Sequence, residues 1–305
     1  MTFPGPAGAV LVGDGGLAST LEGRGHDLSD ALWSARLLLD RPDEIVAVHR
    51  AFLRAGAAVV TSASYQASFE GFAARGLDRA HTERLLRRRV ELARRACAES
   101  DDGPPRWVAA SVGPYGAVLA DGSEYRGCYG RSVAELTAWH RPRIAVLAEA
   151  RPDVLALETI PDVDEAEALL AAAAGIDIPV WLSYSIDGNR TRAGQPLAEA
   201  FALGAGNPQV VAVGVNCCAP DDVAGAVATA RAATGKPVIA YPNSGEGWDA
   251  TPRRWVGAPR FSPDDAARWV DEGARIVGGC CRVGPSAIAA LARALRPVPP
   301  TSRCR

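Results

Sequence analysis

Four of the seven cysteines occur as two adjacent pairs, Cys217-Cys218 and Cys280-Cys281, and each pair directly follows a short apolar run. Thiolates that converge at one place suit Zn²⁺, which takes three protein ligands in catalytic sites and keeps a fourth position open. The same residues also permit a strained vicinal disulfide or ordinary buried thiols. The spacing is not a Cys-x-x-Cys pattern, so the residues alone leave these three interpretations open.

Acidic and aromatic residues also follow apolar runs directly. The segments concerned are 14–16 (Asp-Gly-Gly), 113–116 (Gly-Pro-Tyr-Gly), 158–161 (Glu-Thr-Ile-Pro), Asn216 and 241–246 (Tyr-Pro-Asn-Ser-Gly-Glu). The four histidines, His26, His49, His81 and His140, lie in no such position. A histidine metal ligand is therefore not expected.

Eight apolar runs rich in Val, Ile or Leu are predicted to be strands that are covered on both faces. They span residues 9–14, 57–62, 106–112, 153–158, 179–185, 210–216, 236–241 and 274–279. Each interval is long enough for a helix, and the first three intervals leave room for extra structure. Eight β-then-α units without a break in composition predict one (β/α)8 barrel, in which chemistry gathers at the carboxyl ends of the strands. All the segments above would then share one rim.

Amphipathic segments predict the helices between these strands. They span 41–55, 162–174, 221–234, 263–272 and 285–295, with a further helix from Thr82 onward. The competing doubly wound sheet needs a Gly-x-Gly-x-x-Gly turn after its first strand, and segment 13–16 lacks that spacing. We therefore expect a single barrel domain over 1–305, with a loose Pro-rich tail from about 297.

The composition excludes several classes of partner. The 305 residues carry 33 basic and 35 acidic side chains, for a net charge of −2, which argues against binding to nucleic acid or to an anionic membrane. The first residues do not resemble a signal peptide, and no apolar stretch reaches the length of a membrane helix. A cytoplasmic, reduced protein that acts on small molecules is expected. A monomer is plausible, although the sequence leaves the oligomeric state open.

Four motifs resemble those of the homocysteine S-methyltransferase family in order and spacing. They are 13–16 (Gly-Asp-Gly-Gly), 158–161 (Glu-Thr-Ile-Pro), 214–217 (Gly-Val-Asn-Cys) and 278–281 (Gly-Gly-Cys-Cys). Segments 111–116, 121–125 and 241–246 resemble its bacterial S-methylmethionine-dependent branch. The resemblance implies a (β/α)8 barrel that binds one Zn²⁺ through Cys217, Cys280 and Cys281. Cys218 matches a position where the family does not need cysteine, so we interpret it as packing.

The resemblance also implies the reaction. The thiol of homocysteine would take the open zinc position as a thiolate and attack the methyl group of a sulfonium donor, giving methionine. Glu158 would bind the α-ammonium group of homocysteine, with Asp14 hydrogen-bonding near it. Backbone N–H groups of Gly15 and Gly16 could hold the carboxylate, because glycine permits close approach. Asn216 would either buttress the site or bond the barrel rim.

The donor side is less defined by the sequence. A sulfonium cation is favoured by aromatic faces and carboxylates, and the candidates on the rim are Tyr115, Tyr125, Tyr241, Glu246 and Trp248. S-methylmethionine is the expected donor, with S-adenosylmethionine weaker. Segment 187–196 departs from the Ser/Asp-Gly-Thr-Pro-like turn usual in the family, so donor contacts from it stay open. Betaine as donor, or a zinc-binding barrel without catalysis, are the alternatives.

Overall fold

The computed structural model describes residues 3, 10–28, 38, 40–100, 103–249 and 254–295. Its main sheet has eight parallel strands in the order β1-β12-β9-β8-β5-β4-β3-β2, and a parallel bridge between Gly13 and Val59 joins the two edges. The strands are β1 (Leu11–Val12), β2 (Val59–Thr61), β3 (Trp107–Val112), β4 (Val154–Ile160), β5 (Val180–Tyr184), β8 (Val210–Asn216), β9 (Val238–Tyr241) and β12 (Ala274–Val277). The predicted barrel is confirmed, with a strand at each of the eight expected runs, although β4 continues two residues beyond its run to Ile160.

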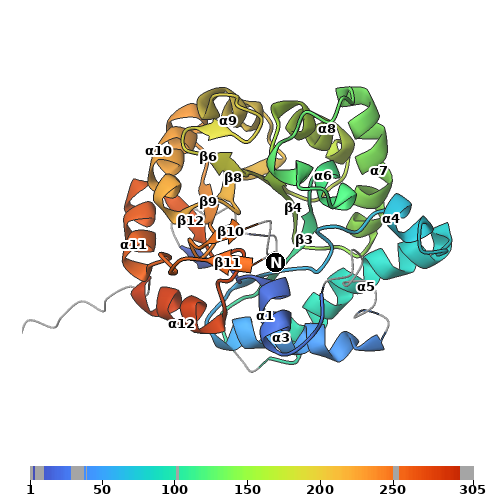
Figure 1. The fold of residues 1–305 in the computed structure, drawn as a ribbon, viewed down its shortest axis with the longest axis horizontal. Coiled ribbons are helices and arrows are strands. Elements are labelled where there is room, and N and C mark those ends of the chain that lie inside the picture. The colour runs from blue at the N-terminus through green and yellow to red at the C-terminus, as the bar shows by residue number, and fades with distance from the viewer. Residues whose placement is uncertain are drawn as a thin grey trace, which may run out of the picture.

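Helices surround the strands as a ring (Figure 1). They are α3 (Pro42–Arg54), α5 (Arg79–Ala98), α7 (Val133–Glu149), α8 (Val163–Ala173), α9 (Leu197–Ala205), α10 (Val223–Thr234), α11 (Pro263–Glu272) and α12 (Pro285–Ala294). Because the sheet is closed and ringed by helices, side chains of every strand are buried on both faces. One face fills the barrel interior with residues such as Trp181, Ile239 and Ile276, and the other packs against the helices.

The first three connections carry extra structure, as their length predicts. The additional elements there are α1 (Leu17–Gly23), α4 (Phe69–Ala73), α6 (Tyr115–Leu119) and the 3₁₀ turn η1 (Ser123–Tyr125). Later connections contain the hairpins β6 (Ile186–Asp187) with β7 (Arg190–Thr191) and β10 (Gly247–Asp249) with β11 (Arg254–Val256), and the 3₁₀ turn η2 (Pro220–Asp222). These loops and turns shape the rim above the strand ends.

Two helices of the ring, α7 and α9, were not delineated by the sequence patterns. The apolar residues of α7 do not gather on one face, and Pro142 lies inside it. Helix α9 is only nine residues long. Helix α5 begins at Arg79 instead of Thr82, because the side chain of Asp78 caps it by accepting from the N–H of His81 at 2.8 Å.

The expected Pro-rich tail falls outside the described residues. Within the described ranges, no helix combines the length and apolar character needed to span a bilayer.

Candidate metal and substrate site

The sulfur atoms of Cys217, Cys280 and Cys281 form a cluster on the carboxyl-end rim. All three lie within 4.8 Å of one another, and the sulfurs of Cys217 and Cys281 are 3.9 Å apart. In a tetrahedral site with metal–sulfur bonds of about 2.3 Å, ligand sulfurs lie about 3.8 Å apart. The three side chains therefore fit a metal ion with one position left for another ligand. No histidine or carboxylate joins this group in the part of the chain that the structure describes.

Cys280 and Cys281 both reach the cluster although they are adjacent, because the chain has already left β12 at Val277. Their N–H groups donate to the carbonyl of Pro242 at 2.7 Å and to Oδ1 of Asn243 at 3.1 Å. In a regular strand two adjacent side chains would point to opposite faces, but that alternation does not apply in this turn.

The two glycines before these cysteines are required by close contacts. A Cβ at Gly278 would lie 2.8 Å from the carbonyl oxygen of Asp14, and one at Gly279 would clash with the side chain of Val283. The carbonyl of Asp14 in turn accepts from the N–H of Gly279 at 2.9 Å. The first and last strands of the barrel thus meet directly beneath the cluster.

Cys217 and Cys218 point to different environments. Cys217 follows β8 with a left-handed backbone (φ +50°), a conformation uncommon outside glycine. Its sulfur faces the cluster, whereas Cys218 is buried in the apolar core, and burial raises the pKa of its thiol. This placement agrees with the interpretation of Cys218 as packing.

Hydrogen bonds distinguish Cys217 from the other two cysteines of the cluster. The thiols of Cys280 and Cys281 hydrogen-bond to its sulfur, as does the hydroxyl of Tyr125 at 3.2 Å, and together they hold the pKa of Cys217 well below its usual range. The hydrogen bonds to Cys217, together with burial, raise the pKa of the Cys280 and Cys281 thiols. A metal ion would displace their remaining protons on binding.

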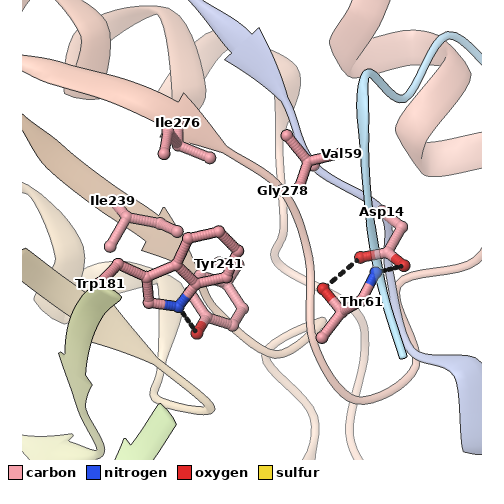
Figure 2. A pocket seen from close by; sticks show the side chains of 9 residues that line it. Asp14, Val59, Thr61, Trp181, Ile239, Tyr241, Ile276 and Gly278 are labelled. Atoms are coloured by element: carbon pink, nitrogen blue, oxygen red, sulfur yellow. Dashed lines mark hydrogen bonds between the residues drawn. The ribbon is translucent and has the colours of Figure 1, made fainter. Parts of the chain in front are cut away.

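Two buried carboxylates lie inside the rim, at the ends of β1 and β4. Oδ2 of Asp14 accepts from the N–H of Thr61 at 2.7 Å and Oδ1 accepts from its hydroxyl at 3.1 Å, and Figure 2 shows both bonds. Burial raises the pKa of Asp14 to about 7 and that of Glu158 to about 7. Neither forms an ion pair with a cationic side chain among the described residues. The pair therefore suits a cationic group of a ligand.

Glu158 is held by hydroxyl groups alone. Ser111 donates to Oε1, and the hydroxyl of Tyr241 donates to Oε2 at 2.9 Å. Tyr241 also bonds Ser183 at 2.7 Å and accepts from the indole of Trp181 at 3.2 Å (Figure 2). The expectation that Tyr241 faces the donor from a rim loop is not met, because its ring points into the barrel. It contacts the carboxylate assigned to homocysteine.

Asn216 acts on the backbone next to Glu158. Thr159 has a left-handed backbone (φ +60°), which is strained for a β-branched residue, and the strand register shifts between Leu157 and Ile160. Oδ1 of Asn216 accepts from the N–H of Thr159 at 2.7 Å, and Nδ2 donates to its hydroxyl at 2.7 Å. These two bonds join the end of β8 to the backbone that follows Glu158.

Gly15 and Gly16 lie where the chain passes close to the last turn. A Cβ at Gly15 would clash with the carbonyl of Val283, and one at Gly16 would lie 2.6 Å from the carbonyl of Cys280. The N–H of Gly16 already donates to the carbonyl of Val283 at 3.0 Å. A ligand carboxylate could bind that N–H only by replacing this bond, so Gly15 is the better candidate of the two.

The residues expected to contact the donor lie at different distances from the cysteine cluster. Tyr125 reaches the cluster, as described above. Tyr115 does not, because its ring packs with Leu136 and Ala168 in a satellite cluster between α6, α7 and α8. Glu246 lies near the cluster but is paired with Arg282 at 2.7 Å, which lowers the pKa of its carboxyl. The side chain of Trp248 lies outside the described part of the structure.

Two residues near the cluster were missed by the sequence reasoning. Tyr65, in the loop after β2, is hydrogen-bonded to the side chain of Thr159, and burial raises the pKa of its phenol. Burial and the neighbouring Cys217 raise the pKa of Glu124 to about 7. Glu124 stands in segment 121–125, whose family resemblance is the signal that points to it, whereas Tyr65 lies in none of the motifs named above.

Fold and site together define a (β/α)8 barrel whose carboxyl-end rim carries a cluster of three cysteines able to hold a metal ion, beside two buried carboxylates. The profile described as homocysteine S-methyltransferase matches residues 11–295. The chain therefore belongs to the homocysteine S-methyltransferase family, as its motifs predicted.

Relatives from plants and bacteria resemble the chain over nearly its whole length. Homocysteine S-methyltransferase 4 of Zea mays is 46% identical over 313 residues, which cover 96% of this chain and 92% of that protein. Homocysteine S-methyltransferase of Escherichia coli K12 is 45% identical over 291 residues, covering 92% and 94%. The crystal structure of the metallated form of the E. coli homocysteine methyltransferase MmuM superposes with a TM-score of 0.83 at 43% identity, covering 94% of this chain and 96% of that one.

Proposed function

We propose that this protein transfers a methyl group from a sulfonium donor to the sulfur of L-homocysteine, forming methionine. The observation that carries the proposal is a thiol cluster joined to a pair of carboxylates without a cationic partner. Tyr241 links the two, since its carbonyl accepts from the N–H of Cys217 at 3.2 Å and its hydroxyl donates to Glu158. An amino acid with both an ammonium group and a thiol can contact both features at once.

We propose Zn²⁺ as the metal, held by Cys217, Cys280 and Cys281, because thiolates at this spacing match its preferred ligands. When bound, zinc supplies the positive charge that lowers the pKa of a thiol, so that the acceptor sulfur is ionised near neutral pH. Three free thiols at ligand distance also need a reducing compartment, which supports a cytoplasmic location.

The acceptor is oriented by the buried carboxylates. Glu158 and Asp14 would bind its ammonium group, and the hydroxyls of Ser111, Thr61 and Tyr241 keep the two carboxylates in place. Holding the amino-acid end in one orientation aims the sulfur at the donor and replaces a bimolecular encounter by a positioned one. Burial also removes water that would solvate the reacting sulfur.

The donor would approach from the side of Tyr125, Tyr65 and Glu124. Aromatic faces and a carboxylate stabilise a sulfonium cation. In the reaction the acceptor sulfur forms a bond to the methyl carbon, and the bond from that carbon to the donor sulfur breaks with its electron pair kept by the donor. The acceptor's thiol proton is lost to solvent. With S-methylmethionine as donor, both products are methionine.

A donor panel tests this proposal. The zinc-loaded protein is incubated with L-homocysteine and one donor at a time, S-methylmethionine, S-adenosylmethionine or betaine, and methionine is measured. We expect the fastest product formation with S-methylmethionine. Product from betaine alone would support the betaine alternative, and zinc binding without product from any donor would support a non-catalytic barrel. Either result would refute the proposed donor class.

A further inference from the structure

Arg192 lies beside the metal cluster in the segment between the hairpin β6–β7 and α9. Its guanidinium carbon is 5.8 Å from the ring centroid of Tyr125, the residue whose hydroxyl reaches Cys217. Its Nε–H donates to Oγ of Ser185 at 3.3 Å, and that hydroxyl donates to the carbonyl of Cys217 at 3.3 Å. Two separate contacts therefore place this cation next to the first ligand residue.

The charge of Arg192 is not balanced by a side chain. Among the described residues it forms no ion pair with a carboxylate, although it is partly buried and its Nε is already engaged. Arg282, which also lies on the rim, differs in this respect, because it forms an ion pair with Glu246 at 2.7 Å. A guanidinium offers two parallel N–H donors, a geometry that matches a carboxylate. An anionic ligand group would complete this arrangement.

We propose that Arg192 binds the α-carboxylate of the sulfonium methyl donor. This inference rests on the proposed function. The acceptor's amino-acid end is assigned to Asp14 and Glu158 inside the barrel, whereas Arg192 contacts Tyr125 and Ser185, which both bond Cys217. Arg192 thus selects an amino-acid sulfonium over a sulfonium that carries no carboxylate.

The length of the donor supports this pairing. In S-methylmethionine four bonds separate the sulfonium sulfur from the carboxyl carbon, a reach of about 5 Å from bonds near 1.5 Å. In betaine only two bonds separate the nitrogen from the carboxyl carbon. A carboxylate site one aromatic ring away from the cluster suits the longer molecule. Arg192 is accordingly a specificity residue for donor length and for donor charge.

Kinetics with two donors test the proposal. Wild type, Arg192→Gln and the control Arg190→Gln are assayed with S-methylmethionine and with (3-aminopropyl)dimethylsulfonium, which lacks the carboxylate. Arg190 is a matched control, because it lies two residues away in β7 and, among the described residues, its side chain bonds only the carbonyl of Gly194 at 2.7 Å. A charge-assisted hydrogen bond contributes about 1.5–3 kcal/mol, equivalent to about 10- to 100-fold in binding.

We expect Arg192→Gln to raise the KM for S-methylmethionine about 10- to 100-fold and to leave the KM for homocysteine within about threefold. The preference for S-methylmethionine over the carboxylate-free donor should fall by the same factor, and calorimetric titration with S-methylmethionine should show the same loss of affinity. Arg190→Gln should match wild type in every measurement. Rescue of part of the loss by Arg192→Lys is expected, since a point charge remains.

Three results would overturn the inference. A rise in the homocysteine KM instead of the donor KM would assign Arg192 to the acceptor. Equal losses with both donors would show that the carboxylate is not what it binds. If wild type makes no methionine from S-methylmethionine, the proposed function itself fails and this inference with it, and that outcome is read from the wild-type assay before any variant is compared.

Discussion

The two sides of the proposed site, one for the acceptor and one for the donor, are built from different parts of the barrel. The acceptor side, comprising Asp14, Glu158, Asn216 and Tyr241, comes from the ends of strands, and both carboxylates are only 7% exposed. The donor side, comprising Tyr65, Glu124, Tyr125 and Arg192, comes from loops, and Tyr125 is 39% exposed. Cys217 contacts both, through the carbonyl of Tyr241 and the hydroxyl of Tyr125.

We expect the strand-end side chains to be rigid and the loop side chains to be more adaptable. Strand-end side chains are fixed by buried hydrogen bonds, and an unpaired polar group there is costly. Loop side chains make fewer contacts, and water can replace the hydrogen bonds that a substitution removes. Substitutions on the acceptor side should therefore have larger effects than equivalent substitutions on the donor side, and those in the shared cluster the largest.

The largest effect is expected for Cys281→Ser. Loss of one thiolate should remove the metal and reduce methionine formation at least about 1,000-fold, because the acceptor thiol is then no longer ionised by a metal. Metal analysis should find about one zinc per wild-type chain and almost none in the variant. Cys218→Ala, next to a ligand but packed in the core, should keep its zinc while losing some stability. Retained activity in Cys281→Ser would refute the three-thiolate site.

Next in size is Glu158→Gln. It removes the charge that binds the ammonium group but keeps a similar shape, so kcat/KM for homocysteine should fall about 30- to 300-fold at unchanged zinc content. Steady-state kinetics with each substrate varied in turn would measure this. The donor KM should change little. A loss expressed in the donor KM instead would show that the two sides are not separate.

A smaller effect is expected from pH. With pKa values raised to about 7, Asp14 and Glu158 hold protons below that pH, and a bound ammonium group must displace them. Affinity for L-methionine, which has the ammonium but no thiol, should fall below pH 7 by up to about tenfold per pH unit for each proton displaced, and be constant above it. Calorimetric titration between pH 5.5 and 8 measures this. A flat profile would contradict the carboxylate assignment.

The same shifts affect stability in the opposite direction. The native state binds more protons than the unfolded state between the ordinary carboxyl range and about pH 7. The contribution of these two groups to the free energy of unfolding of the ligand-free protein therefore decreases as pH rises through that window. Bound methionine should reduce this loss.

The smallest effects are expected from two tyrosines compared as a pair. Tyr125→Phe removes the hydrogen bond to Cys217, worth about 0.5–1.5 kcal/mol, and should lower kcat/KM about 2- to 10-fold. Tyr115→Phe should change neither KM by more than about twofold, because Tyr115 packs away from the site. Kinetics of both variants under identical conditions decide this. Similar losses in the two would contradict the placement of Tyr115.

Much of this arrangement follows from sequence, because continuous apolar runs mark buried strands and chemistry collects at their ends. The inward orientation of Tyr241 could also have been predicted from the sequence. Ile239 lies in the barrel interior, so alternation along β9 also turns Tyr241 inward. Its contact with Glu158 was therefore predictable from register, although it was interpreted as a loop residue.

Other features depend on tertiary contacts that no local pattern carries. Thr159 adopts a left-handed backbone because Asn216, 57 positions later in the chain, bonds both its N–H and its hydroxyl. The N–H of Gly16 is engaged by Val283 at the other end of the barrel. The choice of Cys217 over Cys218 as ligand came from family resemblance, and the left-handed turn at Cys217 gives its structural reason.

The seam between β1 and β12 has a consequence for how the protein is made. Asp14 supports the N–H of Gly279, and the N–H of Arg282 donates to the hydroxyl of Ser19 across a separation of 263 residues. The ribosome must therefore complete almost the entire chain before thiols and carboxylates can meet. Such distant pairing forms slowly. The proposed metal site is accordingly completed late in synthesis, because a nascent chain that holds only Cys217 lacks two of the three thiols.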